Sequence, residues 1–97
     1  MKDQTMETSL NVAQTDNGNS STKEIVEVIA RALVDRPQAV SVVEINGAHA
    51  CIVELSVAKE DVGKIIGRQG RTAAAMRTIV GAVSAKMNKR SVLEIID

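Results

Sequence analysis

One stretch of the 97-residue chain decides the fold, and it reads Val62-Gly63-Lys64-Ile65-Ile66-Gly67-Arg68-Gln69-Gly70-Arg71-Thr72. Two glycines, Gly67 and Gly70, enclose two polar residues between two segments with helical patterns. Each glycine lacks a Cβ, so it can adopt a positive φ and lets a ligand approach the main chain closely. The helix that begins near Arg71 would add free N–H groups and the positive end of its dipole. The stretch therefore predicts a tight junction of two helices that favours an anion.

A helix is expected well before this junction, over residues 22–34. Ser21 and Glu24 match the capping-box pattern at its start, and Pro37 prevents its continuation. Apolar residues recur at helical spacing along it, at Ile25, Val28, Ile29, Ala32 and Leu33.

A β-hairpin is expected next. Residues 40–45 are rich in β-branched side chains, residues 51–57 alternate in polarity, and Asn46-Gly47 is a strong signal for a two-residue turn. If Asn46 and Gly47 form the turn, two cross-strand pairs follow, and their members share one face of the hairpin. These pairs are Val42 with Cys51 and Val40 with Val53.

The remaining elements complete the order. We expect a short helix over residues 59–66, a long helix over 71–87 and a strand over 91–96. The order is therefore helix, strand, strand, helix, helix, strand. The two helices favour a parallel pairing of the last strand with the second, through a right-handed connection. The sequence thus predicts an α+β fold with a three-stranded mixed sheet and all helices on one face.

Positive charge is concentrated in one part of the chain. The whole sequence has 12 basic and 12 acidic residues, yet residues 59–90 hold eight basic and two acidic ones, a net charge of +6 against −6 for the remainder. One face should therefore attract an anion such as the phosphates of a nucleic acid. The sequence has no aromatic residue, so any RNA contact must use backbone, aliphatic and charged groups.

Enzyme classes fit the sequence poorly. A phosphate-loop enzyme needs G-x-x-x-x-G-K-[ST], whereas Gly67 lies only three residues before Gly70, and Arg71 follows. His49 and Cys51 are the only residues of their types, which is too few for a zinc site, and neither has a catalytic partner. We expect no enzymatic activity, no metal and no cofactor.

The ends of the chain suggest its organisation and location. Residues 1–20 are polar and lack an apolar period, which predicts a disordered tail before a single folded domain over residues 21–97. No run approaches the roughly 18 apolar residues that span a bilayer, and no secretory signal is recognisable. We therefore expect a cytoplasmic protein with no membrane partner.

Three segments carry a resemblance to a known family: Glu60 to Ala73, Met76-Arg77-Thr78-Ile79-Val80, and Leu93-Glu94-Ile95-Ile96-Asp97. Together they resemble the small bacterial RNA-binding proteins of the KhpA type, which have a single type II K-homology (KH) domain. The resemblance covers about residues 22–97. The tail before Ser21 lies outside it, and Ala73 stands where many KH domains carry a larger aliphatic residue under the bound bases.

This resemblance implies a protein that binds single-stranded RNA, in RNA-level regulation or ribosomal RNA processing. The G-x-x-G loop of KH domains clamps the backbone of about four nucleotides. The alternative is a protein-interaction module that uses a KH fold to dimerise, with weak or no RNA binding. The expected RNA-binding residues are Gly67, Arg68, Gln69 and Gly70 in the loop, Arg71 beside it, Lys64, Ile65 and Ile66 along one wall of the groove, and Lys89 and Arg90 at the other wall.

The long helix has a second face that predicts self-association. Thr72, Met76, Ile79, Val80, Val83 and Met87 should face the sheet, whereas Ala74, Ala75, Thr78, Gly81, Ala82 and Ala85 lie nearly opposite. A glycine costs about 1 kcal/mol relative to alanine in an exposed helix, so Gly81 suggests that another backbone comes near. The predicted dimer interface is Ala75, Thr78, Ile79 and Ala82, and the resemblance supports a homodimer or a pair with a second KH protein.

Overall fold

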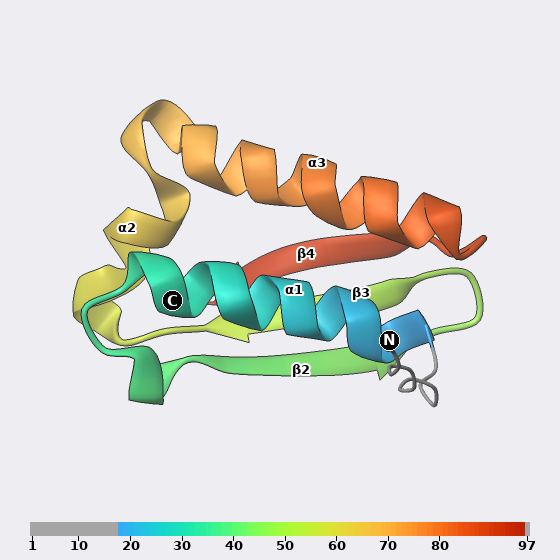
Figure 1. Ribbon diagram of the computed structural model, residues 1–97, viewed down its shortest axis with the longest axis horizontal. Coiled ribbons are helices and arrows are strands. Elements are labelled where there is room, and N and C mark those ends of the chain that lie inside the picture. Colours follow the sequence, from blue (N-terminus) through green and yellow to red (C-terminus); the bar gives the residue numbers. More distant parts are fainter. Residues whose placement is uncertain (1–17, 97) are drawn as a thin grey trace, which may run out of the picture.

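The computed structural model describes residues 18–96, and its helices and strands follow the predicted order (Figure 1). Over these residues, no helix has both the length and the apolar character needed to cross a membrane. The helices and strands are α1 Gly18–Leu33, β2 Ser41–Asn46, β3 Cys51–Ser56, α2 Val62–Ile66, α3 Arg71–Lys86 and β4 Ser91–Ile96, with 3-10 turns at Pro37–Ala39, Lys59–Asp61 and Arg68–Gly70.

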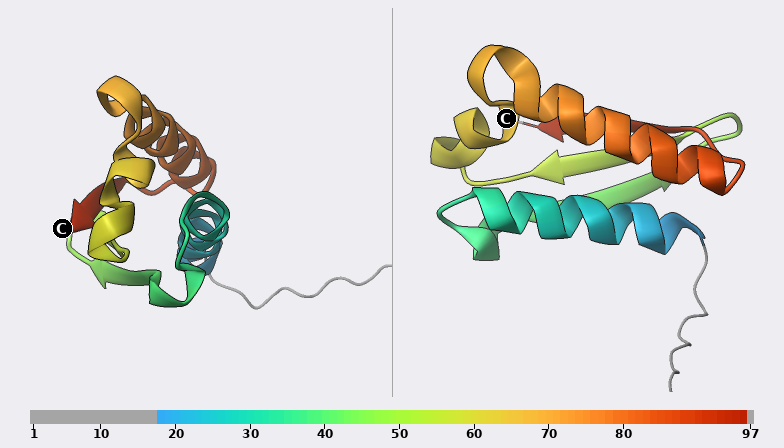
Figure 2. Two further views of the ribbon diagram at one scale, coloured as in Figure 1. Left: turned by 90° about the vertical axis from the view of Figure 1, so that its left-hand side faces the viewer. Right: turned by 45° about the horizontal axis from the view of Figure 1, so that its top comes forward.

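The three strands form one mixed sheet in the order β2-β3-β4. β2 and β3 are antiparallel, and β3 and β4 are parallel, as predicted. The helices lie on one face of the sheet, with α1 and α3 across it and α2 near one end (Figures 1 and 2). The predicted α+β class and mixed sheet are therefore confirmed.

The core fills the layer between the sheet and the helices. Alternate residues of β3 are buried, and Ile65 is the residue through which α2 joins the core. Most core side chains are aliphatic, which fits a small domain with one apolar layer. The buried cluster comprises Val26, Ala30, Val34, Val40, Val42, Cys51, Val53, Leu55, Ile65, Met76, Val80 and Leu93.

The first helix starts earlier than the sequence predicts. α1 begins at Gly18, so Ser21 lies inside the helix and does not cap it. Thr22, the fifth residue of the helix, is buried. Residues 18–20 therefore belong to the helix, and residues 1–17 of the predicted tail lie outside the described residues.

The predicted register of the hairpin is wrong, although its faces are right. Val42 pairs with Leu55, and Asn46 pairs with Cys51, so the loop has four residues and is closed by a 2.9 Å bond from the Gly47 N–H to the Ala50 carbonyl. Neither Asn46 nor Gly47 has the positive φ that the tighter turn requires. The shift is an even number of residues, so the predicted inward face stays inward. Its four members, Val40, Val42, Cys51 and Val53, are all buried.

The buried stripe of α3 also differs from the predicted one. Met76 and Val80 are buried as expected, whereas Ile79 is 41% exposed. Ala73 and Ser84 are buried instead. The prediction counted only large apolar residues and overlooked small residues that allow close packing. The predicted buried face was therefore rotated about the helix axis relative to the observed one.

Candidate nucleic-acid interface

The loop between α2 and α3 has an unusual backbone. Gly67 has φ 77° and ψ 173°, Gln69 has φ 56° and Gly70 has φ 75°, so three of its four residues have positive φ. α2 ends with a 2.9 Å hydrogen bond from the Gly67 N–H to the Gly63 carbonyl. The Gly70 N–H donates to the Gly67 carbonyl at 3.1 Å. The backbone therefore reverses sharply before α3 begins (Figure 1).

Gly67 is required here for two reasons. Its φ and ψ lie in a region that is essentially restricted to glycine. A Cβ at this position would also collide with the side-chain hydroxyl of Thr72, which lies directly behind the loop. At Gly70, by contrast, a Cβ would meet nothing within 4 Å, so only the left-handed backbone favours glycine there. Close packing of Thr72 therefore fixes the first glycine of the loop.

The polar side chains of the loop are available to a ligand. Arg68, Gln69 and Arg71 are exposed, and an Nη atom of Arg71 donates to the Gln69 amide oxygen at 3.4 Å. α3 starts at Arg71, whose own N–H donates to the Arg68 carbonyl, and the start of a helix is the positive end of its dipole. The loop thus combines two guanidinium groups with the positive end of a 16-residue helix, which suits a phosphate.

A groove of about 260 Å³ lies beside the loop. Its floor includes Ala73, the small residue at the position expected to lie under the bases. The Nε–H of Arg77 donates to the Leu93 carbonyl of β4 at 3.3 Å, which brings the guanidinium to the edge of the sheet. The mostly apolar groove is lined by Val62, Ile66, Gly70, Ala73, Arg77 and Ile95.

The sequence-based prediction missed three lining residues of this groove: Val62, Arg77 and Ile95. Val62 lies one helical turn before Ile66, and Arg77 one turn after Ala73, so helical spacing from the predicted positions could have found both. Ile95 comes from β4, and only the packing of α3 against that strand brings it to the loop.

The structure places the two isoleucines of the predicted groove wall on different sides of α2. Ile66 lines the groove and is 40% exposed. Ile65 is fully buried in the core and does not line the groove. The short α2 turns one isoleucine to the groove and the other to the core, because adjacent residues differ by about 100° around a helix.

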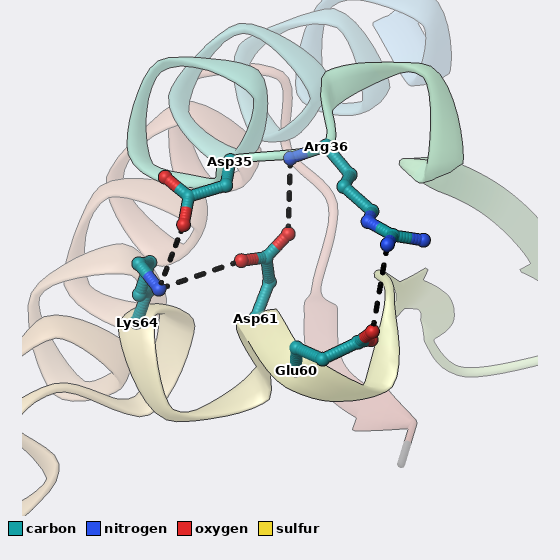
Figure 3. Close-up of polar contacts among 5 residues, drawn as sticks. All are labelled: Asp35, Arg36, Glu60, Asp61 and Lys64. Atoms are coloured by element: carbon teal, nitrogen blue, oxygen red, sulfur yellow. Dashed lines mark hydrogen bonds and ion pairs between the residues drawn. The ribbon is translucent and has the colours of Figure 1, made fainter.

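Lys64 lies on the side of α2 that contacts the end of α1. Its Nζ is 3.2 Å from Oδ2 of Asp35 and 3.5 Å from Oδ1 of Asp61 (Figure 3). Oδ2 of Asp61 accepts a 3.1 Å hydrogen bond from the backbone N–H of Arg36, whose guanidinium is 3.7 Å from Glu60. These five residues join the turn after α1 to the start of α2.

Ionisation follows from these contacts. Burial opposes the charge of Asp61, but the backbone N–H groups of Asp35 and Arg36 and the ammonium of Lys64 outweigh it, so the pKa of Asp61 lies below its ordinary value. The hydrogen bond to Asp35 is the main reason that the pKa of Lys64 lies above its ordinary value. Asp61 and Lys64 are therefore both charged at neutral pH.

Lys89 and Arg90 lie far from the loop. They follow α3, at the opposite end of a helix that is about 24 Å long at 1.5 Å per residue (Figure 1). With the hairpin residues 46–51 and Asn88 they line a second hollow of about 280 Å³. Burial raises the pKa of nearby Glu44, and the charges of Lys23 and Lys89 partly oppose that rise. The two basic residues are thus at the far end of the domain, not at the opposite wall of the groove.

The predicted dimer residues share an uncovered face of α3. Ala75, Thr78, Ile79 and Ala82 are all exposed, and the Thr78 hydroxyl donates to the Ala74 carbonyl at 3.1 Å. Ile79 is thus an apolar side chain at the surface of the domain, where a partner could cover it.

The metal-ligating side chains of residues 18–96 are dispersed, and the thiol of Cys51 is buried. No three His, Cys, Asp or Glu side chains in this range gather closely enough to hold a metal ion. Cys51 is buried, and burial, followed by the charge of Glu44, raises the pKa of its thiol. A protonated thiol in the core is a poor nucleophile.

Comparison with known proteins gives the family. The sequence model described as "KhpA/KhpB, KH domain" matches residues 23–95. Three relatives named "RNA-binding protein KhpA" come from Clostridium perfringens, Caldanaerobacter subterraneus subsp. tengcongensis and Chlamydia pneumoniae. The first is 54% identical over 74 residues, which are 76% of this chain and 99% of the relative. The second is 56% identical over 73 residues, which are 75% of this chain and 97% of the relative. The third is 49% identical over 75 residues, which are 77% of this chain and 96% of the relative. No solved structure matches the chain significantly.

The match includes the loop, both helices beside it and nearly all of the sheet. With its mixed sheet, its Gly67–Gly70 loop and its matches along almost the whole length of the relatives, this chain belongs to the KhpA/KhpB family of KH-domain proteins.

Proposed function

We propose that this chain binds single-stranded RNA, without a catalytic step, in the groove between the Gly67–Gly70 loop and β4. The observation that carries the proposal is the junction of a glycine-restricted, cationic loop with an apolar groove of about 260 Å³. The names of the relatives, RNA-binding protein KhpA, agree with it.

The loop would hold the RNA backbone. The close approach allowed at Gly67 and Gly70, the start of α3 and the charges of Arg68 and Arg71 all favour phosphate, and Gln69 offers an amide. A KH loop of this kind clamps the backbone of about four nucleotides. Since phosphate contacts carry no direct sequence information, the loop would position the strand and leave base selection to the groove.

The groove would hold the bases. Ile66 and Ala73 offer apolar contact, and Arg77 offers donors at the edge of β4. Without aromatic side chains on which bases could stack, each base contributes less binding free energy, so the affinity for a short RNA should be modest. Lys89 and Arg90 would contribute only to an RNA that runs the length of β4.

The test is a titration of a fluorescently labelled 12-nucleotide single-stranded RNA at several salt concentrations. Each phosphate neutralised adds about −0.7 to the slope of log K against log salt, so two to four contacts predict a slope of about −1.4 to −2.8. A duplex of the same sequence should bind more weakly, because its bases cannot enter the groove. Absence of binding at low salt, or a slope near zero, would refute the proposal.

We also propose that α3 supports pairing with a second copy or with another KH protein. The exposed Ile79 and its small neighbours Ala75, Thr78 and Ala82 support this. Pairing would place two grooves in one particle, and linked weak sites raise the affinity for a longer strand. Such a protein would act on RNA in the cytoplasm, where the single buried thiol of Cys51 would stay reduced.

A further inference from the structure

We infer that Lys64 is a positioning residue, which fixes α2 and the loop after it through Asp61 and Asp35, and that it does not itself contact RNA. The inference rests on the RNA-binding function proposed above. It separates Lys64 from Arg68 and Arg71, although all three are basic residues within or close to the loop.

The direction of the side chain is the first argument. Val62 and Ile66 line the groove from one face of α2, because residues four apart lie on the same side of a helix. Lys64 is two residues from each, about 200° round the helix from Val62. Its ammonium points to Asp35, in the turn after α1 (Figure 3). Lys64 therefore lies on the side of α2 opposite the groove-lining residues.

The partners of Lys64 are the second argument. Two carboxylates already lie within 3.5 Å of its ammonium, and they would repel a phosphate brought to the same place. Among the described residues, Arg68 and Arg71 form no ion pair with a carboxylate, and both are exposed beside the loop. Phosphate should therefore go to the two arginines.

Burial of Asp61 explains why this cluster can fix α2. The Asp61 side chain is only 1% exposed, and a buried carboxylate is tolerated where charge and hydrogen bonds compensate it. Oδ2 of Asp61 accepts from the Arg36 N–H, Oδ1 lies 3.5 Å from the Lys64 ammonium, and the Asp35 N–H adds a further hydrogen bond, so both oxygens have partners. α2 starts at the next residue and is five residues long, so its direction sets where Gly67 lies.

The salt dependence of RNA binding distinguishes positioning from contact. Lys64→Met should weaken binding of the labelled RNA several-fold and leave the slope of log K against log salt as in the wild type. Arg71→Met, which removes a proposed phosphate contact, should make the slope less steep by about 0.7. A Lys64→Met slope that falls by the same amount, or an unchanged affinity, would overturn the inference.

For Asp35→Asn, the positioning and contact accounts predict opposite changes in RNA affinity. Asp35 is exposed, so its replacement leaves the core unchanged. If Lys64 acts by positioning, this variant binds RNA more weakly than Glu24→Gln, a matched loss of one exposed carboxylate from α1. If Lys64 contacted phosphate, release from Asp35 would strengthen binding. Affinity equal to or above that of the control would contradict the inference.

Amide spectra of the RNA-free protein separate this inference from the function on which it rests. The ¹⁵N–¹H signals of residues 67–70 should shift in Lys64→Met and in Asp35→Asn, and should stay in place in Glu24→Gln. A wild type that fails to bind RNA would remove the proposed function and would leave this measurement valid. Loop signals that do not move in Lys64→Met would show that Lys64 has no positioning role.

Discussion

Oδ2 of Asp61 accepts a 3.1 Å hydrogen bond from the backbone N–H of Arg36, which lies 25 residues earlier in the chain. The bond joins the turn after the first helix to the start of the segment that presents the loop (Figure 3). It is formed by a carboxylate that is almost completely buried and is charged at neutral pH, with Lys64 beside it. The stability of this junction should therefore depend on pH.

Asp61 should make folding sensitive to acid. Its pKa is lower in the folded protein than the ordinary value of about 3.9, so the unfolded chain binds the proton more readily. The stability that Asp61 contributes is thus complete above that value and is lost as the pH falls through the lowered one. Chemical unfolding of wild type and Asp61→Asn should give a constant difference in free energy above about pH 5 and a shrinking one below about pH 4. A difference that stays constant down to pH 2.5 would contradict the assigned ionisation.

Replacement of Gly67 should damage both the fold and RNA binding. Gly67→Ala would place a side chain in a glycine-only backbone region, which should lower the free energy of unfolding by about 1–3 kcal/mol. The new Cβ would also collide with Thr72. The matched control is Gly63→Ala in α2, where a Cβ meets nothing within 4 Å and alanine should be neutral or stabilising by up to about 1 kcal/mol. Thermal unfolding and RNA titration of both variants check this. Equal behaviour of the two alanines would mean that the loop tolerates a Cβ.

Filling the floor of the groove should reduce RNA affinity, and overpacking this buried position should cost about 1–3 kcal/mol of stability. Ala73→Leu would extend a side chain toward Ile66 and Ile95, into the space proposed for a base. Ala74→Leu, at the next and exposed position of α3, is the control and should bind like the wild type. Titration with homopolymeric RNAs measures affinity and base preference together. If Ala73→Leu binds each of them as the wild type does, bases do not enter this groove.

Local patterns predicted the elements well, because each strong signal is contained in a few neighbouring residues. The spacing of Gly67 and Gly70 predicted the loop, and the order of the periodic segments predicted the mixed sheet. Errors arose where a distant contact decides the outcome. The register of the hairpin depends on a loop closed at Ala50, and the separation of Ile65 from Ile66 depends on how a five-residue helix is held. No sequence pattern near Lys64 predicts its ion pair with Asp35, because Asp35 lies in the turn after α1 and only the fold brings the two residues together.

The α3 face should control assembly. Ala82→Arg would put a long charged side chain into the proposed interface, so the wild type should have the mass of a dimer and the variant that of a monomer, by light scattering. Ala32→Arg, at an exposed alanine of α1, is the matched control and should remain dimeric. A monomeric wild type, or a folded Ala82→Arg variant that still dimerises, would exclude this interface for homodimers.

The most direct test of the central claim is RNA binding by a variant in which both loop side chains are acidic, Arg68→Asp with Gln69→Asp. Both residues are exposed, so the fold should persist, and two carboxylates beside phosphate should weaken binding at least about a hundredfold. The control, Arg31→Asp with Gln38→Asp, makes the same change in charge at exposed residues away from the loop, where screening limits the loss to a few-fold. The account predicts loss of binding for the loop variant alone, with both variants folded by circular dichroism. A folded loop variant that binds RNA as tightly as this control would contradict it.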